Sequence, residues 1–161
     1  MTDEAPEAPP PPPPPPPPAM AGAGIVRAAW WGTAAFVVVA VAATITPDTF
    51  GIVALVLDVA LFAVGCIVFA VAFFRAADRS RTQAIGIGGL FFLAGDVAPP
   101  AVRNRLVGAL AVQTVVGLVT AGIRLYTNLA AGTLVPVFGL GLCGLWAATH
   151  GRFARRTPTP K

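Results

Sequence analysis

Three polar residues in otherwise apolar stretches are the first candidates for chemistry. Asp58 lies inside IVALVLDVALFAVG, while Gln113 and Arg124 lie in a later apolar segment. An acid at the centre of a membrane helix costs about 2.5 to 3.5 kcal/mol on the insertion scale, so it often marks an ion site or pairs with a base. We therefore predict an intramembrane polar site in which Asp58 pairs with Arg124 beside Gln113. In the alternative, Arg124 extends to the outer headgroups and Asp58 is protonated.

Helical spacing places these polar residues on faces rich in small side chains, which allow neighbouring membrane helices to approach closely. The small residues are Ala54, Gly65 and Ala72 around Asp58, and Ala109, Gly117 and Ala121 around Gln113. We expect both faces to point into a helix bundle and to serve as contact surfaces.

Other chemistry has little support. Cys66 and Cys143 lie in apolar runs without a C-x-x-C motif, which argues against a disulfide framework or redox site. His150 has no second ligand at metal-binding spacing. The net charge of +4 comes from scattered arginines rather than a basic patch interleaved with aromatics, so nucleic acid is not an expected partner. The sequence predicts no enzymatic activity and no cofactor.

The polar residues are carried by a chain of membrane-protein composition. Of its 161 residues, 56% are hydrophobic and 11% are charged, whereas soluble domains have about 25% charged residues. Four apolar segments are each close to the roughly 20 residues that a membrane-crossing helix needs. They cover residues 28–46, 52–74, 106–126 and 129–149. We predict an all-α membrane protein whose domain, residues 27–151, is a bundle of four transmembrane helices.

Residues at the ends of these segments support the assignment. Pro47 stops the first segment, and Asn128 separates the last two. Trp30, Trp31, Tyr126 and Trp146 fall where an interfacial aromatic belt is expected. The fourth segment contains Pro136, Gly139, Gly141 and Gly144. These residues indicate either a hinged helix or, as we favour, a packing surface.

Lysine and arginine predict the orientation. With a cytoplasmic N-terminus, ten basic residues lie inside and only Arg124 lies outside, which agrees with the positive-inside rule. The inside residues are Arg27, Arg75, Arg79, Arg81, Arg103, Arg105, Arg152, Arg155, Arg156 and Lys161. We expect a multi-pass protein of the plasma (inner) membrane with both termini in the cytoplasm.

The stretch IGIGGLFFLAG, residues 85–95, lies in the predicted cytoplasmic loop 75–105. As a straight helix its eleven residues would reach only about 16 Å, and crossing would separate the flanking arginines. We predict a non-spanning segment, either interfacial or re-entrant, packed against the bundle. Gly88 and Gly89 would let its backbone bend, and Phe91 and Phe92 would supply an apolar plug.

The two tails are polar. Residues 1–26 contain acidic residues and ten consecutive prolines, which favour a solvated polyproline II rod. We expect a disordered cytoplasmic tail, and a docking site for an aromatic groove is the less favoured alternative. We expect residues 152–161 to form a basic cytoplasmic tail.

Two stretches, RSRTQAIGIGGLFFLAG (79–95) and LVPVFGLGLCGLWAATHGRF (134–153), resemble a group of small, uncharacterised four-span membrane proteins of actinobacteria. The resemblance covers about residues 50–156 and implies a bacterial inner membrane. It supplies no activity and therefore no functional residues. The acid expected in that group near Gln83 and Ala84 has no counterpart here.

Two functions follow as expectations. The favoured one is a non-enzymatic assembly or scaffold protein that contacts the lipid bilayer and binds another membrane protein, or a second copy of itself, through small-residue faces and its arginine-rich loop. The alternative is a small proton- or cation-linked transporter that uses Asp58.

Overall fold

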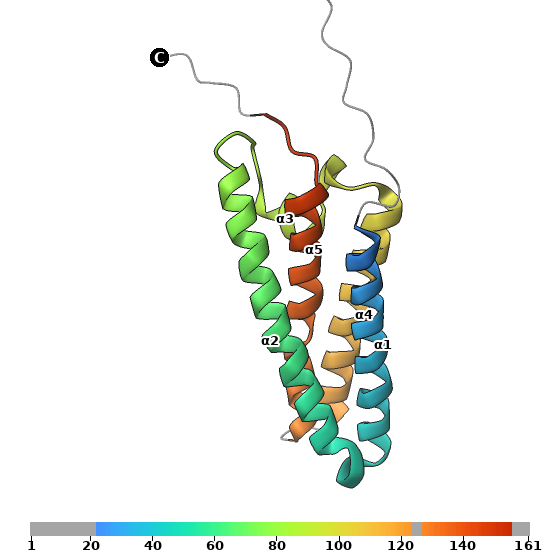
Figure 1. Ribbon diagram of the computed structural model, residues 1–161. Helices are drawn as coiled ribbons and strands as arrows, with labels where there is room; N and C mark the ends of the chain where they lie inside the picture. The colour runs from blue at the N-terminus through green and yellow to red at the C-terminus, as the bar shows by residue number, and fades with distance from the viewer. Residues whose placement is uncertain (1–21, 124–126, 156–161) are drawn as a thin grey trace, which may run out of the picture.

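The computed structural model describes residues 22–123 and 127–155. Four long helices form a bundle, as the sequence predicts (Figure 1): α1 (Ala23–Ile45), α2 (Pro47–Arg79), α4 (Pro100–Ile123) and α5 (Pro136–His150). Shorter elements are α3 (Ile87–Phe92) and the 3-10 helices η1 (Gly95–Val97) and η2 (Asn128–Leu134). In the described ranges the only β-type pairing is one isolated bridge between Gln83 and Arg155. The all-α prediction is confirmed.

The helices alternate in direction along the chain. In Figure 1, α1 and α4 begin at the upper end, where α2 and α5 finish. α1 packs against α2 and α4, and α5 packs against the same two helices. The closest association is between α2 and α5. Both ends of the described chain therefore lie at one end of the bundle.

Four segments are long and apolar enough to cross a membrane: Ala23–Ile45, Pro47–Arg79, Pro100–Ile123 and Leu129–His150. The last of them combines most of η2 with α5. Large apolar side chains also cover the outside of the bundle, and Val38, Ile52 and Ile67 are 67%, 70% and 65% exposed. Soluble monomers rarely expose continuous apolar surfaces of this kind, whereas lipid tails accommodate them. The chain is a multi-pass membrane protein.

The helices extend beyond the predicted apolar spans. α2 has 33 residues, which correspond to about 50 Å and exceed the roughly 30 Å of hydrocarbon. α4 begins at Pro100 rather than near residue 106, because proline fits the first turn of a helix. α1 begins at Ala23, three residues before the predicted end of the N-terminal tail. Hydropathy marks the part of a helix that lies in lipid, but alanine and arginine continue the helix beyond it.

The fourth span is discontinuous. Residues 128–134 form a 3-10 helix, and regular α-helix begins only at Pro136. Proline has no backbone N–H and clashes with a preceding helical turn, so the change of helix type falls where the sequence places it. The glycines of this span also form the packing surface that we favoured, since they lie close to atoms of other helices. The change of helix type and the packing surface therefore occur in the same span.

Glycines bring α2 and α5 into backbone contact. A Cβ atom on Gly65 of α2 would lie 2.6 Å from the backbone nitrogen of Phe138 in α5. A Cβ on Gly141 would lie 2.8 Å from the carbonyl oxygen of Gly65, and one on Gly144 would lie 2.7 Å from the ring of Phe91. Since lipid tails are as apolar as leucine, such close van der Waals packing is what holds membrane helices together.

Segment 85–95 does not cross the bundle. Its helix α3 has six residues and packs against α5 at the end where α2 finishes. Phe91 is buried and stacks on Phe69 of α2 with ring centroids 4.5 Å apart. Phe92, which we expected in the same apolar plug, is 54% exposed. The buried apolar side chains of this segment are Leu90, Phe91 and Leu93, which are 5%, 6% and 0% exposed.

The two glycines of this segment have different surroundings. A Cβ on Gly89 would lie 3.1 Å from Val97 and 3.3 Å from Phe153, whereas Gly88 is exposed. Trp146 is 1% exposed and packs against Gly22, so its ring faces the bundle interior rather than the headgroups. Of the predicted tails, only residues 22–26 and 152–155 belong to the described part of the chain.

We expect Gly65→Ala to destabilise the bundle, because the added methyl group meets backbone atoms that cannot move independently. Overpacking of this kind costs about 1 to 3 kcal/mol. Gly51→Ala is the matched control, since Gly51 lies in the same helix and no atom lies within 4 Å of its added Cβ. The midpoint of unfolding in mixed SDS micelles should fall for Gly65→Ala only. Equal midpoints for both variants would contradict the backbone contact.

Candidate functional site

Asp58 lies in the interior of the bundle, only 3% exposed. It shares the buried face of α2 with Ala54, Gly65 and Ala72, the small residues predicted from helical spacing, and with Gly51 and Ala76. A Cβ on Gly132 would lie 3.5 Å from Asp58 Oδ2 and 3.4 Å from the ring of Phe36. The carboxyl group is therefore packed against η2, beside an aromatic ring of α1.

Arg124, the predicted counter-ion, lies outside the described residues, as does Tyr126. The Asp58–Arg124 ion pair stays a prediction. α4 is described as far as Ile123, so Arg124 follows it directly in the chain.

Gln113 is fully buried and connects two helices. Its Nε2 donates a hydrogen bond of 2.7 Å to Thr33 Oγ1 on α1. Thr33 Oγ1 in turn donates a bond of 2.7 Å to the carbonyl oxygen of Ala29. Thr33 is not among the polar residues predicted from the sequence. The available signal was its place on one helical face with Ala29, Phe36 and Ala40, all of which are buried.

The other end of the Gln113 amide has no such partner. Among the described residues Oε1 is buried without a hydrogen bond, and a Cβ on Gly139 would lie 2.6 Å from it. The amide cannot gain by turning over, because the Thr33 hydroxyl already donates its proton to Ala29 and can only accept. A buried acceptor without a donor is costly. This oxygen is therefore an acceptor held against the backbone of α5.

The structure does not merge the predicted polar residues into one site. Asp58 contacts the fourth span at Gly132, and Gln113 contacts it at Gly139. A separation of seven residues corresponds to about 10 Å along a helix. Asp58 and Gln113 thus lie at different levels of the bundle, one beside η2 and the other beside α5.

All described arginines lie at one end of the bundle. They belong to the start of α1 and α4, the end of α2 and the segments that adjoin those ends (Figure 1). They are Arg27, Arg75, Arg79, Arg81, Arg103, Arg105, Arg152 and Arg155. The opposite end carries Asp48, in the first turn of α2.

Arg79 ties the C-terminal segment to this end. Its Nη1 donates to the carbonyl oxygen of Ala148 at 2.7 Å, and its Nη2 donates to that of Gly151 at 3.0 Å. Both oxygens lie at the end of α5, where a cation is also favoured by the helix dipole. The backbone nitrogen of Ala84 donates to Ala154 O at 2.8 Å. Residues 151–155 are therefore held against the connection between α2 and α3.

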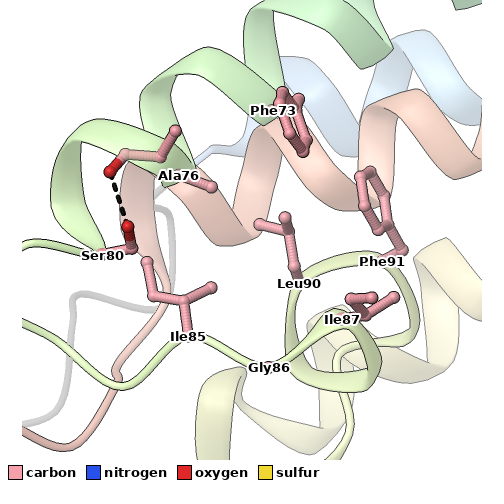
Figure 2. Close-up of a pocket in the computed structure, with 9 residues that line it drawn as sticks. Phe73, Ala76, Ser80, Ile85, Gly86, Ile87, Leu90 and Phe91 are labelled. Atoms are coloured by element: carbon pink, nitrogen blue, oxygen red, sulfur yellow. Dashed lines mark hydrogen bonds between the residues drawn. The ribbon is translucent and has the colours of Figure 1, made fainter.

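An apolar cavity of about 230 Å³ lies between α2 and the α3 segment. Figure 2 shows its lining residues, with Ile85 and Leu90 facing the α2 side. The lining residues are Phe73, Ala76, Ala77, Ser80, Ile85, Gly86, Ile87, Leu90 and Phe91. The interior polar residues described above do not contribute to it.

Within the described ranges, no three or more His, Cys, Asp or Glu side chains gather as a metal site would require. No protein-family model matches the chain, and no curated protein or solved structure matches it significantly. The resemblance to four-span actinobacterial proteins stays a prediction.

Removing either partner of the Gln113–Thr33 hydrogen bond should have a different effect on stability. Thr33→Val leaves Gln113 Nε2 without its acceptor and should destabilise the bundle by about 0.6 to 2 kcal/mol. Gln113→Met removes the unpaired Oε1 and leaves Thr33 bonded to Ala29, so it should be nearly neutral or stabilising. Unfolding in SDS micelles measures both. In the double mutant the cost of Thr33→Val should disappear, and additive effects would show that the bond contributes nothing.

Proposed function

We propose that this chain is a non-enzymatic protein of a bacterial plasma membrane, with both termini in the cytoplasm, that assembles with another membrane protein through the outer face of α4. The observation that carries this proposal is an outward face of α4 on which Gly108 and Gly122 have open space beside them, next to an apolar groove shared with α1. The small-residue faces around Asp58 and Gln113 are already occupied inside the bundle.

The faces first expected to bind a partner are used inside this chain. The face around Asp58 packs against the fourth span through Gly65. On α4, a Cβ on Gly117 would lie 2.6 Å from the carbonyl oxygen of Gly132. Close approach within the bundle consumes these surfaces, so they are not available to a second protein.

The opposite side of α4 carries an outward row of glycine, alanine and valine residues. Gly108, Ala111, Val115, Val119 and Gly122 share one helical face. No atom lies within 4 Å of a Cβ added to Gly108 or Gly122, while Val115 and Val119 are 60% and 52% exposed. A transmembrane helix can approach most closely where small residues leave room.

A groove of about 300 Å³ borders this row. It is formed by apolar and threonine side chains of α1 and α4, namely Val41, Thr44, Ile45, Val115, Val116, Val119, Thr120 and Ile123. β-branched side chains have few rotamers, so little side-chain entropy is lost when a partner packs on them. This surface favours an apolar helix as the partner.

Bulky substitutions in the row test this surface. Gly108→Leu and Gly122→Leu should abolish a crosslinked complex recovered from the native membrane, because the side chains fill the space beside α4. Ala60→Leu is the control, since Ala60 is exposed on α2. Mass spectrometry of the crosslinked band distinguishes a different protein from a second copy of this chain. Undiminished recovery with both glycine variants would rule out this face.

The orientation is supported by the gathering of the described arginines at one end, since cytoplasmic regions carry the excess of basic residues. Two exposed threonines mark the two ends of the bundle. Thr49 lies in the first turns of α2, and Thr82 lies just after its end.

Cysteine labelling tests this orientation in a background without Cys66 and Cys143. Thr49→Cys should react with a membrane-impermeant maleimide in intact cells, and Thr82→Cys should react only after lysis. The two sites are matched in residue type and exposure, so accessibility alone separates them. Labelling of Thr82→Cys in intact cells would reverse the orientation.

Transport remains the alternative that the sequence suggested for Asp58. Transport sites usually need several polar groups along a path through the membrane. The grooves named above are lined by other residues, and Asp58 is packed against η2. Assembly is therefore the function that the geometry favours.

A further inference from the structure

A second groove between α1 and α4 lies at the arginine end of the bundle and has a different chemical character. Its volume is about 470 Å³. It is lined by Val26, Arg27, Trp30, Trp31 and Ala34 of α1 and by Arg105 of α4. Two cations from separate helices thus border one opening together with two indole rings.

The charges favour an anion. Arg27 and Arg105 are both exposed, and no residue that lines the groove is acidic. Both α1 and α4 begin at this end, so the positive ends of their dipoles point the same way. The planar guanidinium group matches the oxygens of a phosphate in a bidentate arrangement.

The remaining lining favours a lipid over a soluble anion. Four of the six lining residues are apolar or aromatic. Trp30 and Trp31 are 44% and 76% exposed, and tryptophan prefers the depth at which lipid headgroups meet the hydrocarbon. Ala34 continues the groove one turn further along α1, where an acyl chain would lie.

We propose that this groove binds an anionic phospholipid, with its phosphate between Arg27 and Arg105 and an acyl chain along Trp30 and Ala34. Basic pockets between transmembrane helices are the kind of site that holds such headgroups. This site shares no lining residue with the α4 row proposed for a protein partner, which begins at Gly108.

A neighbouring groove provides the matched control. It is lined by Phe92, Ala94, Arg103, Asn104, Val107, Gly108 and Ala111. Arg103 carries the same charge as Arg105 and lies on the same helix at the same end of the bundle. It is, however, the only arginine in that groove. A general attraction between lipid and basic surface would treat the two arginines alike.

Binding of phosphatidylglycerol to the purified full-length protein in neutral detergent tests the proposal. The melting temperature should rise with phosphatidylglycerol but not with phosphatidylcholine or inorganic phosphate. With about 1 kcal/mol for each basic residue near an anionic headgroup, Arg27→Gln with Arg105→Gln should weaken binding about thirtyfold. Arg103→Gln should leave the affinity unchanged.

Two further variants keep the test decisive. Arg27→Lys with Arg105→Lys retains the charge and should bind more weakly than the natural chain, because lysine cannot engage a phosphate bidentately; it provides the readout if the glutamine variant does not fold. The N-terminal acids Asp3, Glu4 and Glu7 are the competing anions within this chain. Replacing them by Asn and Gln should leave the affinity for phosphatidylglycerol unchanged.

Three results would overturn the lipid site. Equal stabilisation by inorganic phosphate would identify a site for soluble anions. Equal weakening by Arg103→Gln would show only a diffuse basic surface. Tighter lipid binding after neutralisation of the N-terminal acids would show that this chain's own acidic segment occupies the groove.

Discussion

A guanidinium group in hydrocarbon costs about 2.5 to 3.5 kcal/mol on the insertion scale, and this cost organises the chain. Every described arginine lies at one end of the bundle, where α1 and α4 begin and α2 and α5 finish. The same restriction keeps segment 85–95 from crossing. An arginine at this end also stabilises the fold, since Arg79 donates hydrogen bonds to the carbonyl oxygens of Ala148 and Gly151 at the end of α5. The basic end is thus a folded surface as well as a concentration of charge.

Inside the bundle, shape replaces hydrophobicity as the selective force, because lipid and apolar side chains are equally apolar. Gly65 and Gly141 let α2 and α5 touch through their backbones. The polar side chains fill the remaining space between the helices. Gln113 Nε2 bonds to Thr33 while Gln113 Oε1 lies against Gly139, and Asp58 lies against η2. Polar contacts in this interior specify which helices meet, while the glycines determine how closely.

The two proposed contact surfaces lie on the same side of the molecule, along α1 and α4. α2 and α5 are the most closely associated helices, and the buried small-residue face of α2 packs against α5. α1 and α4 together form both grooves. The apolar row of Gly108 and Gly122 suits a helix, whereas Arg27 and Arg105 suit a phosphate nearer the arginine end. A bound lipid and a bound protein would then be neighbours along α4.

Sequence alone determined the class of fold, the number of spans and the non-spanning character of segment 85–95. Hydropathy and arginine position set these features, and both are properties of single residues that transfer energies describe. Tertiary structure decided that Phe91 rather than Phe92 faces the interior, that Trp146 is buried, and that Gln113 bonds to Thr33, 80 residues away in the chain. Such choices depend on the summed packing of faces from distant helices. No single residue's hydropathy or helical spacing contains that information.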